Sequence, residues 1–362
     1  EKFNNKTNGI THRRWLVASN PELTDLITQN IGKGFIKNPL ELSKLAEFGL
    51  CHDIIFLEKL AKIKRNNKVK LSNFVKDRQH FLLDPDTLFD VQVKRIHAYK
   101  RQLLKAFHIL ELYFDIMDNP NKTFQPMTFL FGGKAAPGYA YAKLVIKFIN
   151  SIANLVNNDP KTKGILNVLY LENYNVSFAQ RIFPASDISE QISTASKEAS
   201  GTGNMKFMMN GAITVGTMDG ANIEIAEAVS DANIITFGKS VAEILRHYRD
   251  KDYNSLNVYR SNYKLSRILD TLRGNFYKDA RYDEFLPIWD SLITYNDEYF
   301  VLEDFPSYVE AMNKAMYLYR NEPMKWLSMS AVNIAQSGRF SSDETIRKYA
   351  AEIWDLKENK IL

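Results

Sequence analysis

The chain has 362 residues, 45% of them hydrophobic and 25% charged, a balance that supports a packed core and argues against intrinsic disorder. Its 47 basic and 42 acidic side chains give a formal net charge of +5, which suits anionic small ligands and nucleic acid equally well. No apolar run reaches the roughly 18–20 residues that a membrane span requires. The first eight residues are polar and lack the apolar core of an export signal, so we expect a cytoplasmic protein with no membrane partner.

Cys51 is the single cysteine, which excludes an internal disulfide. Because an apolar run follows it at residues 54–57, we expect Cys51 to be packed in a core. The six histidines are scattered without the spacing of metal ligands, so the sequence predicts no metal site.

Short strand-like runs alternate with helical patterns along the chain. Residues 41–47 and 53–75 are predicted to be helices, and residues 89–93 alternate with period two as a strand does. The elements that follow are a helix over 99–117, a strand over 127–131, a helix over 139–156, and strands over 166–171 and 212–216. This alternation predicts an α/β fold, a doubly wound parallel sheet with helices on both faces.

The last third of the chain is predicted to be largely helical. Over residues 242–356, helix breaks are expected near Gly274, Pro287, Pro306 and Pro323. Ser341 stands where a capping side chain would begin a final amphipathic helix over 346–354. We therefore divide the chain into a connector over 1–20, a domain over 21–340 and a C-terminal helix over 341–362.

The motif richest in candidate ligands is Glu-Ala-Ser-Gly-Thr-Gly-Asn-Met-Lys, from Glu198 to Lys206. Gly201 and Gly203 permit close backbone approach, and Asn204 is expected to cap a helix whose first amides point at an anion. The motif lacks the spacing of a nucleotide P-loop and the third glycine of a dinucleotide fingerprint. Two interpretations stay open with equal weight: a phosphate cradle with a lysine at its rim, or a glycine-rich turn before a helix with a surface lysine.

A second motif places four cations and a histidine at a strand-to-helix junction: Lys94, Arg95, His97, Lys100 and Arg101. Such side chains hold anions by charge-assisted hydrogen bonds, although runs of charged residues more often form a solvated basic helix start. Cations at a helix amino end oppose the helix dipole, which favours a bound anion. The segments 131–139, 172–176 and 217–222 are interpreted as structural turns, of which 172–176 follows a strand and is placed to line a cleft.

These segments together resemble the glycogen, starch and maltodextrin phosphorylases, the α-glucan phosphorylase family. Order and spacing agree over residues 4–15, 94–103, 133–138, 187–193, 198–206, 216–222 and 340–343. The resemblance implies the second, Rossmann-like domain of a two-domain glycosyltransferase architecture, preceded by its connector. His12 and Asn175 stand where mammalian members carry proline and arginine, which favours a bacterial member.

The resemblance implies phosphorolysis of an α-1,4-glucan by inorganic phosphate, which releases glucose 1-phosphate with retained configuration. It makes Lys206 the residue that binds pyridoxal 5′-phosphate, whose phosphate group serves as acid and base. The further cofactor contacts implied are Thr202, Gly203, Lys100 and Tyr174. The cations implied around the reacting phosphates are Lys94, Arg95 and Lys100. The positions implied to bind the glucosyl hydroxyls are Asn8, Tyr99, Glu198, Ser200 and Gly201.

The family also takes a phosphate loop and sugar contacts from its first domain. We therefore expect the 362-residue chain to be inactive alone, to need the N-terminal half of the same enzyme, and to belong to a homodimer when complete. One alternative is a nucleotide-sugar-dependent glycosyltransferase domain, which would carry no pyridoxal phosphate. Another is a non-catalytic module that binds a glucan or an anion. Nucleic-acid binding is not expected, because the aromatic residues are not interleaved with the basic ones.

Overall fold

A six-stranded, fully parallel sheet forms the centre of the protein in the computed structural model, which describes residues 3–357. The spatial order of the strands is β3-β2-β1-β4-β5-β6. The chain runs outward from β1 to β3, returns to the centre, and runs outward again to β6, so the predicted doubly wound α/β class is confirmed. The strands are β1 (Leu88–Val93), β2 (Met127–Gly132), β3 (Leu166–Leu171), β4 (Ile188–Gln191), β5 (Ile213–Gly216) and β6 (Ile235–Thr236).

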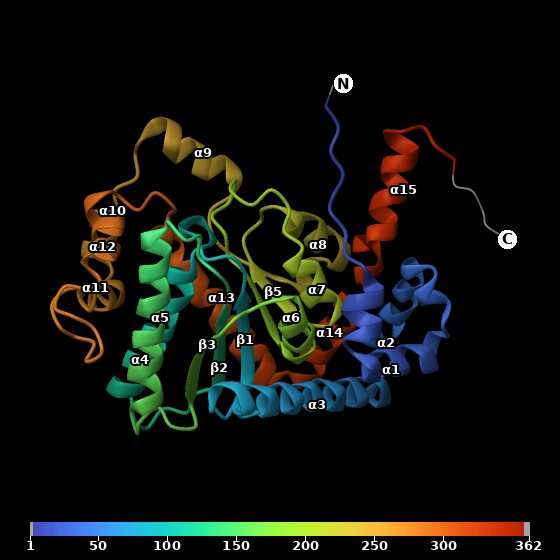
Figure 1. The fold of residues 1–362 in the computed structure, drawn as a ribbon, viewed down its shortest axis with the longest axis horizontal. Helices are drawn as coiled ribbons and strands as arrows, with labels where there is room; N and C mark the ends of the chain where they lie inside the picture. The colour runs from blue at the N-terminus through green and yellow to red at the C-terminus, as the bar shows by residue number, and fades with distance from the viewer. Residues whose placement is uncertain (1–2, 358–362) are drawn as a thin grey trace.

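Helices cover both faces of the sheet, and Figure 1 shows α4 and α5 on one side of the strands and α6 and α7 on the other. One core cluster joins the sheet to α4 (Gln102–Asp118), α5 (Ala140–Asn158), α11 (Tyr263–Asp270) and α13 (Val301–Asn321). The second joins it to α1 (Pro21–Ile31), α3 (Ile54–Gln79), α6 (Val176–Ala185), α7 (Gly203–Met209) and α8 (Ala221–Val229). The helix α14 (Pro323–Gln336) contributes to both clusters.

The period-two alternation in β1 does not reflect one buried and one exposed face, because all six residues of this strand are buried. Phe89 and Val91 pack in the cluster with α3, whereas Asp90 faces α4. A polar side chain that is buried on a covered sheet needs an internal partner. Lys105 of α4 supplies it, with 3.0 Å between its Nζ and Asp90 Oδ1.

The remaining helical elements are short or lie at the ends of the chain. Within residues 3–357, no helix combines the length and the apolar character that a bilayer span requires. The remaining helical elements are η1, a π-helix (Arg13–Ala18), η2 (Gly34–Ile36), η3 (Pro39–Leu45), α2 (Ala46–Leu50), η4 (Ala98–Lys100), η5 (Asp231–Asn233), α9 (Val241–Asp250), α10 (Ser255–Ser261), α12 (Leu286–Trp289), η6 (Asp290–Thr294), η7 (Ser337–Phe340) and α15 (Ser342–Glu352).

Three local predictions differ from the structure. The helix predicted over 41–47 is mostly the tight 3₁₀ turn η3, which Pro39 begins. Pro306 lies inside α13, in its second turn, where the missing amide removes only the bond to the Leu302 carbonyl. Cys51 is exposed at the end of α2 and is not part of a core.

The two ends of the described chain run beside each other (Figure 1). Ile10 forms an isolated parallel bridge with Ser341, and Lys6 Nζ lies 2.7 Å from Glu352 Oε2 of α15. Ser341 Oγ accepts a hydrogen bond of 3.2 Å from Glu344 N, which confirms the predicted start of the last helix. Residues 1–2 of the predicted connector and 358–362 of the predicted C-terminal segment lie outside the described residues. The domain boundaries stay a prediction.

Candidate active site

The site lies where β1 and β4, neighbours in the sheet, both end. In a doubly wound sheet the chain leaves two such central strands toward opposite sides, and a crevice opens at their carboxyl ends. Lys94 follows β1, and its Nζ donates a hydrogen bond of 2.9 Å to Gln191 Oε1 at the end of β4. Burial, and then repulsion from Lys100, lower the pKa of Lys94 to about 8. The crevice therefore contains a cation that an incoming anion would stabilise.

Lys100 and Glu198 form the second polar pair of the crevice. Lys100 Nζ lies 2.6 Å from Glu198 Oε2, which also accepts a hydrogen bond of 3.0 Å from Ser193 Oγ. Burial alone would raise the pKa of Glu198, but the Lys100 hydrogen bond and the charges of Lys100 and Lys94 outweigh it and lower that pKa. Glu198 is thus an ionised acceptor. Tyr99 lies beside its partner Lys100, with 4.7 Å between the ring centroid and Lys100 Nζ.

The turn that contains Ser200 and Gly201 is held by the segment over 217–222. Asp219 Oδ2 accepts a hydrogen bond of 2.8 Å from Glu198 N, and Ala221 N donates one of 2.8 Å to the Ser200 carbonyl. Gly220 has φ +54°, and a Cβ there would lie 2.7 Å from that same carbonyl oxygen. The segment was expected to be a structural turn, and its specific task is to fix the backbone of the site loop.

Lys206 lies on α7 in a half-buried, aromatic environment. Its Nζ is 4.4 Å from the ring centroid of Trp15 and 5.9 Å from that of Phe183. The ammonium has no hydrogen-bond or ion-pair partner among residues 3–357, and burial lowers its pKa. An amine that loses its proton more readily is a better nucleophile toward a carbonyl group.

The capping role predicted for Asn204 is wrong. The helix begins at Gly203, two residues earlier than that role requires, and Thr202 occupies the cap position. Asn204 Nδ2 instead donates a hydrogen bond of 3.0 Å to Asn222 Oδ1. Thr202 and Gly203 are half-buried, and a Cβ at Gly203 would meet no atom within 4 Å, so open space adjoins this backbone.

The loop after β2 approaches Lys94 closely. Lys94 N donates a hydrogen bond of 2.9 Å to the Gly132 carbonyl, and a Cβ at Gly133 would overlap the Lys94 carbonyl oxygen. Tyr174, after β3, packs over Gly132, and burial raises the pKa of Tyr174 to about 12. Gly133 therefore has a steric function at the site.

Two residues predicted for the site stand apart from these contacts. Arg95 is exposed, and Asn8 is exposed on the N-terminal segment. The neighbour of Asn8, Thr7, bonds to Glu224 of α8 at 2.7 Å. Within residues 3–357, no hydrogen bond or ion pair joins either side chain to Lys94, Lys100 or Glu198.

Arg101 is the main departure from the predicted cluster of anion-binding cations, because it is buried and fully engaged with protein groups. Its Nε donates to the Ile192 carbonyl at 2.7 Å, and its Nη1 donates to Asp304 Oδ2 at 2.6 Å. It therefore holds the segment after β4 against α13. Sequence reasoning also gave no role to Gln191 or Ser193, although the motif over 187–193 was a signal.

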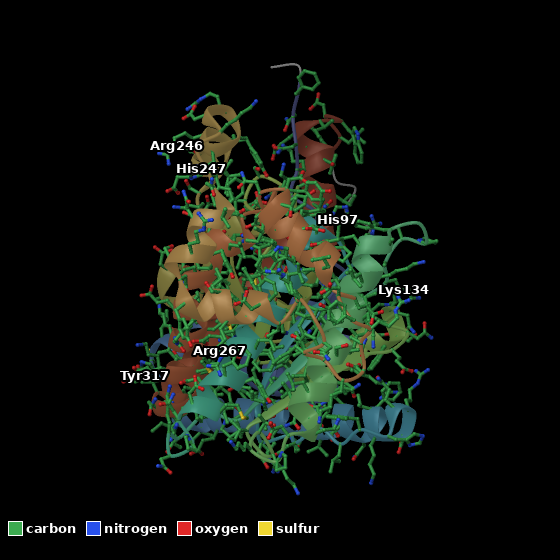
Figure 2. The ribbon with its side chains drawn as sticks, turned by 90° about the vertical axis from the view of Figure 1, so that its left-hand side faces the viewer. His97, Lys134, Arg246, His247, Arg267 and Tyr317 are labelled. Carbon is green, nitrogen blue, oxygen red and sulfur yellow. The ribbon has the colours of Figure 1, made fainter. Side chains whose placement is uncertain are left out.

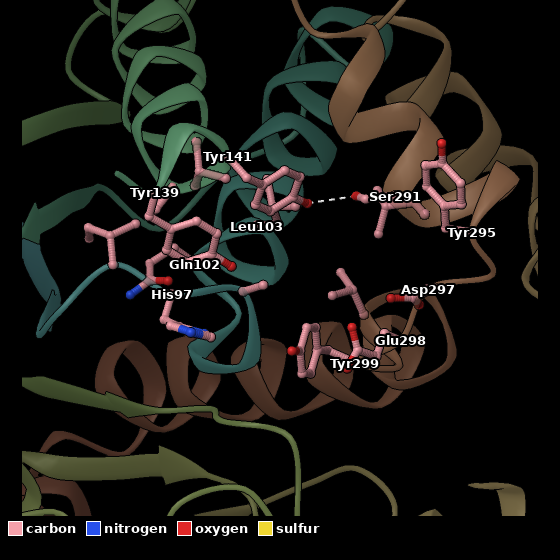
Figure 3. A pocket seen from close by; sticks show the side chains of 16 residues that line it. His97, Gln102, Leu103, Tyr139, Tyr141, Ser291, Tyr295, Asp297, Glu298 and Tyr299 are labelled. Carbon is pink, nitrogen blue, oxygen red and sulfur yellow. Dashed lines mark hydrogen bonds between the residues drawn. The ribbon is translucent and has the colours of Figure 1, made fainter. Parts of the chain in front are cut away.

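A hollow of about 340 Å³ flanks the site between η4, α5 and the segment before α13 (Figure 3). His97, Tyr139 and Tyr299 line it, and Tyr141 Oη and Ser291 Oγ are 2.7 Å apart across it. The His97 ring packs on Tyr99, with 4.8 Å between the ring centroids. Figure 2 shows that His97 and Lys134, which follow β1 and β2, lie on the side of the molecule away from Tyr317. The hollow thus lies beside the segment that follows the carboxyl end of β1.

Comparison with known proteins agrees with this arrangement. A family model described as "Carbohydrate phosphorylase" matches residues 1–356. The chain is 50% identical over 356 residues to a glycogen phosphorylase of Bacillus subtilis and 48% identical over 358 residues to one of Synechocystis. It is 46% identical over 361 residues to the liver form of glycogen phosphorylase of Homo sapiens.

These alignments cover 98%, 99% and 100% of this chain, but 44%, 42% and 42% of the three relatives. The chain therefore spans less than half the length of the curated relatives it matches. The family match itself covers almost every residue of the chain. The chain belongs to the carbohydrate phosphorylase family.

Proposed function

We propose that this chain is the carboxyl-terminal part of an α-1,4-glucan phosphorylase. The enzyme would break the bond between an anomeric carbon and a glycosidic oxygen, and join that carbon to inorganic phosphate on the same face. The products would be glucose 1-phosphate and a shortened glucan. The names of the three compared relatives support this reaction. The observation that carries the proposal is the half-buried amine of Lys206 after the glycine-rich turn, which has no hydrogen-bond or ion-pair partner in the described part of the chain.

The residues around Lys206 fit pyridoxal 5′-phosphate. The amine has a lowered pKa, Trp15 offers an aromatic wall, and open space adjoins Gly203. Lys206 would hold the cofactor covalently, with Thr202, Gly203, Lys100 and Tyr174 as its further contacts. When bound, the cofactor supplies a phosphate group whose second pKa, near ~6, allows proton exchange around neutral pH.

The substrate phosphate would be held by Lys94 and Arg95, with Lys100 as a shared partner of both phosphates. Among the described residues 3–357, the Lys94 Nζ bonds only to the neutral amide of Gln191, so an anion can replace Gln191 without breaking an ion pair. Lys100 is different, because an anion must compete with Glu198 for it. Cations fixed in a partly buried crevice stabilise developing negative charge more strongly than the same groups in water.

The glucosyl unit would be oriented by Glu198, Ser200, Gly201, Tyr99 and Asn8. Glu198 is ionised and can accept hydrogen bonds from sugar hydroxyls, and its orientation is fixed by Ser193 and Lys100. The Gly201 backbone has φ +81°, which turns the loop so that the chain can pass close to a ligand. Binding of the sugar would thus draw Glu198 and Lys100 into one network with the phosphates.

The alternative functions are less well supported. A nucleotide-sugar-dependent transferase has no use for a lysine in the Lys206 environment, and a non-catalytic module needs no amine with a lowered pKa. We further propose that the first half of the same enzyme completes the site, and that the complete enzyme is a homodimer. A cytoplasmic location and a bacterial source stay predictions.

Phosphorolysis by the full-length enzyme tests the proposal. With glycogen and inorganic phosphate it should release glucose 1-phosphate, and Lys206→Ala should abolish this release. Lys143→Ala, which removes an exposed lysine of α5, is the matched control and should leave the rate unchanged. Cleavage that does not depend on phosphate, or a Lys206→Ala enzyme with full activity, would contradict the proposal.

A further inference from the structure

Two carboxyl groups lie next to each other in the interior, on neighbouring strands below the site. Asp90 of β1 and Glu190 of β4 are both completely buried. Asp90 is paired in register with Ile188, so Glu190 lies two residues further along and on the same face of the sheet. Glu190 immediately precedes Gln191, and Asp90 lies four residues before Lys94.

The hydrogen bonds available to this pair are limited. Lys105 Nζ donates to the Asp90 carbonyl at 2.9 Å, to Asp90 Oδ1 at 3.0 Å and to the Leu130 carbonyl at 3.3 Å. An ammonium has three N–H groups, so Lys105 has none left for Glu190. Tyr308 Oη of α13 donates one bond of 2.7 Å to Glu190 Oε1.

The two remaining oxygens, Asp90 Oδ2 and Glu190 Oε2, have no donor among residues 3–357. The two carboxyl groups are nevertheless within hydrogen-bonding contact of each other. Two ionised carboxylates cannot bond to one another, because each offers only acceptor lone pairs. A single proton between them gives one group a donor and satisfies both oxygens.

The charges of the surrounding groups agree with this count. Burial lowers the pKa of His108 on α4 to about 4, so the ring is neutral, and burial raises the pKa of Tyr308 far enough to keep its hydroxyl protonated. Arg101 is neutralised by Asp304 at 2.6 Å. Lys105 is the cation bonded to the pair within residues 3–357, and with both carboxyls ionised its single positive charge would face two negative ones. Lys94 also interacts electrostatically with Glu190, but its Nζ donates to Gln191 and, within residues 3–357, to neither carboxyl.

We propose that Asp90 and Glu190 share one proton at neutral pH. This shared proton stabilises the contact between β1 and β4 near Lys94 and Gln191, and it does so in a pH-dependent way. Burial, and then the charge of Asp90, raise the pKa of Glu190 well above its usual value. The folded state therefore binds a proton that the unfolded state releases above about pH 4.3. The contribution of this proton to the free energy of unfolding therefore falls as pH rises above that value. Once Glu190 has ionised in the folded state, the contribution no longer changes with pH.

Infrared difference spectroscopy of the full-length holoenzyme tests the shared proton directly. The spectrum of wild type minus Glu190→Gln at neutral pH should contain the carbonyl band of a protonated carboxyl group, and that band should shift in heavy water. Wild type minus Glu310→Gln, an exposed carboxyl on α13, should contain only carboxylate bands. A Glu190→Gln difference spectrum with carboxylate bands alone would overturn the proposal.

The dependence of the thermal unfolding midpoint on pH tests whether the shared proton stabilises the contact between β1 and β4. The amide of Glu190→Gln can donate to Asp90 and accept from Tyr308 at every pH. Its midpoint should therefore equal that of wild type in mild acid and exceed it by a margin that grows toward alkaline pH. A constant difference at all pH values, or an amide variant that does not fold, would overturn the proposal.

Discussion

Lys94 Nζ and Gln191 Oε1, 2.9 Å apart, join the ends of the two central strands of the sheet. The contact spans the point where the strand order reverses, and this is where doubly wound folds bind ligands. Lys94 has a neutral partner, whereas the neighbouring Lys100 has an ionised one in Glu198. The arrangement therefore leaves one cation of the crevice available for an anion.

The affinity for inorganic phosphate should fall as pH rises through about 8, the pKa of Lys94. Below this value Lys94 is charged and binds the anion; above it the free enzyme loses that charge. The KM for phosphate of the full-length enzyme should rise by up to about tenfold per pH unit in this range. Lys94→Arg stays charged and should show a flat profile. If the KM of the Lys94→Arg enzyme depended on pH as that of the wild type does, the titrating group would be a residue other than Lys94.

Removal of the Lys94 charge should slow the reaction severely. Lys94→Met keeps the length of the side chain but cannot stabilise a phosphate, so kcat/KM for phosphate should fall by about 10²–10³-fold. Steady-state kinetics of the full-length enzyme measure this, with Lys143→Met as the control at an exposed position. A loss of less than about threefold would contradict a phosphate contact by Lys94.

Gly133→Ala should destabilise the protein, because Gly133 has φ +153° and a Cβ would lie 2.9 Å from the Lys94 carbonyl carbon. We expect a loss of about 2–4 kcal/mol in the free energy of unfolding, together with displacement of Lys94. Gly138→Ala in the same loop is the matched control, since a Cβ there meets nothing within 4 Å. Denaturant unfolding of both variants distinguishes steric conflict from a general intolerance of the loop.

Arg101→Met should cost about 3–5 kcal/mol, because it leaves Asp304 buried without its partner. The double variant Arg101→Met with Asp304→Leu should recover part of that loss, since neither charge is then buried alone. Arg249→Met, which removes an exposed pair with Asp250, should change stability by less than about 1 kcal/mol. Equal losses in Arg101→Met and Arg249→Met would show that the buried pair has no special weight.

The sequence predicts much of the fold, for reasons that particular residues make clear. Apolar runs locate β2 and β3 to within one residue. All six residues of β2 are buried, and strands buried on both faces are continuously apolar, whereas the edge strand β3 is only partly buried. It predicts no strand over 188–191, although β4 is central, since Ser189 and Glu190 interrupt the apolar pattern there. Those two side chains are tolerated only because tertiary partners such as Tyr308 satisfy them. Local pattern reasoning has no access to such partners.

The candidate site was partly predictable. Lys94, Lys100 and Glu198 are predicted site residues, and the fold brings them into one crevice. The sequence could not separate Arg101 from its neighbours, because the difference lies in burial against Asp304, 203 residues away. It also gave no sign that Trp15 lies against Lys206, because contacts between distant segments exist only in the folded chain.

The central claim, that Lys206 carries the cofactor, is tested most directly by borohydride reduction of the full-length enzyme with pyridoxal 5′-phosphate, followed by peptide mapping. Lys206→Ala is the control. We predict one phosphopyridoxyl adduct, on Lys206, and none in the control. Reduction that labels scattered surface lysines equally in both proteins would contradict the assignment.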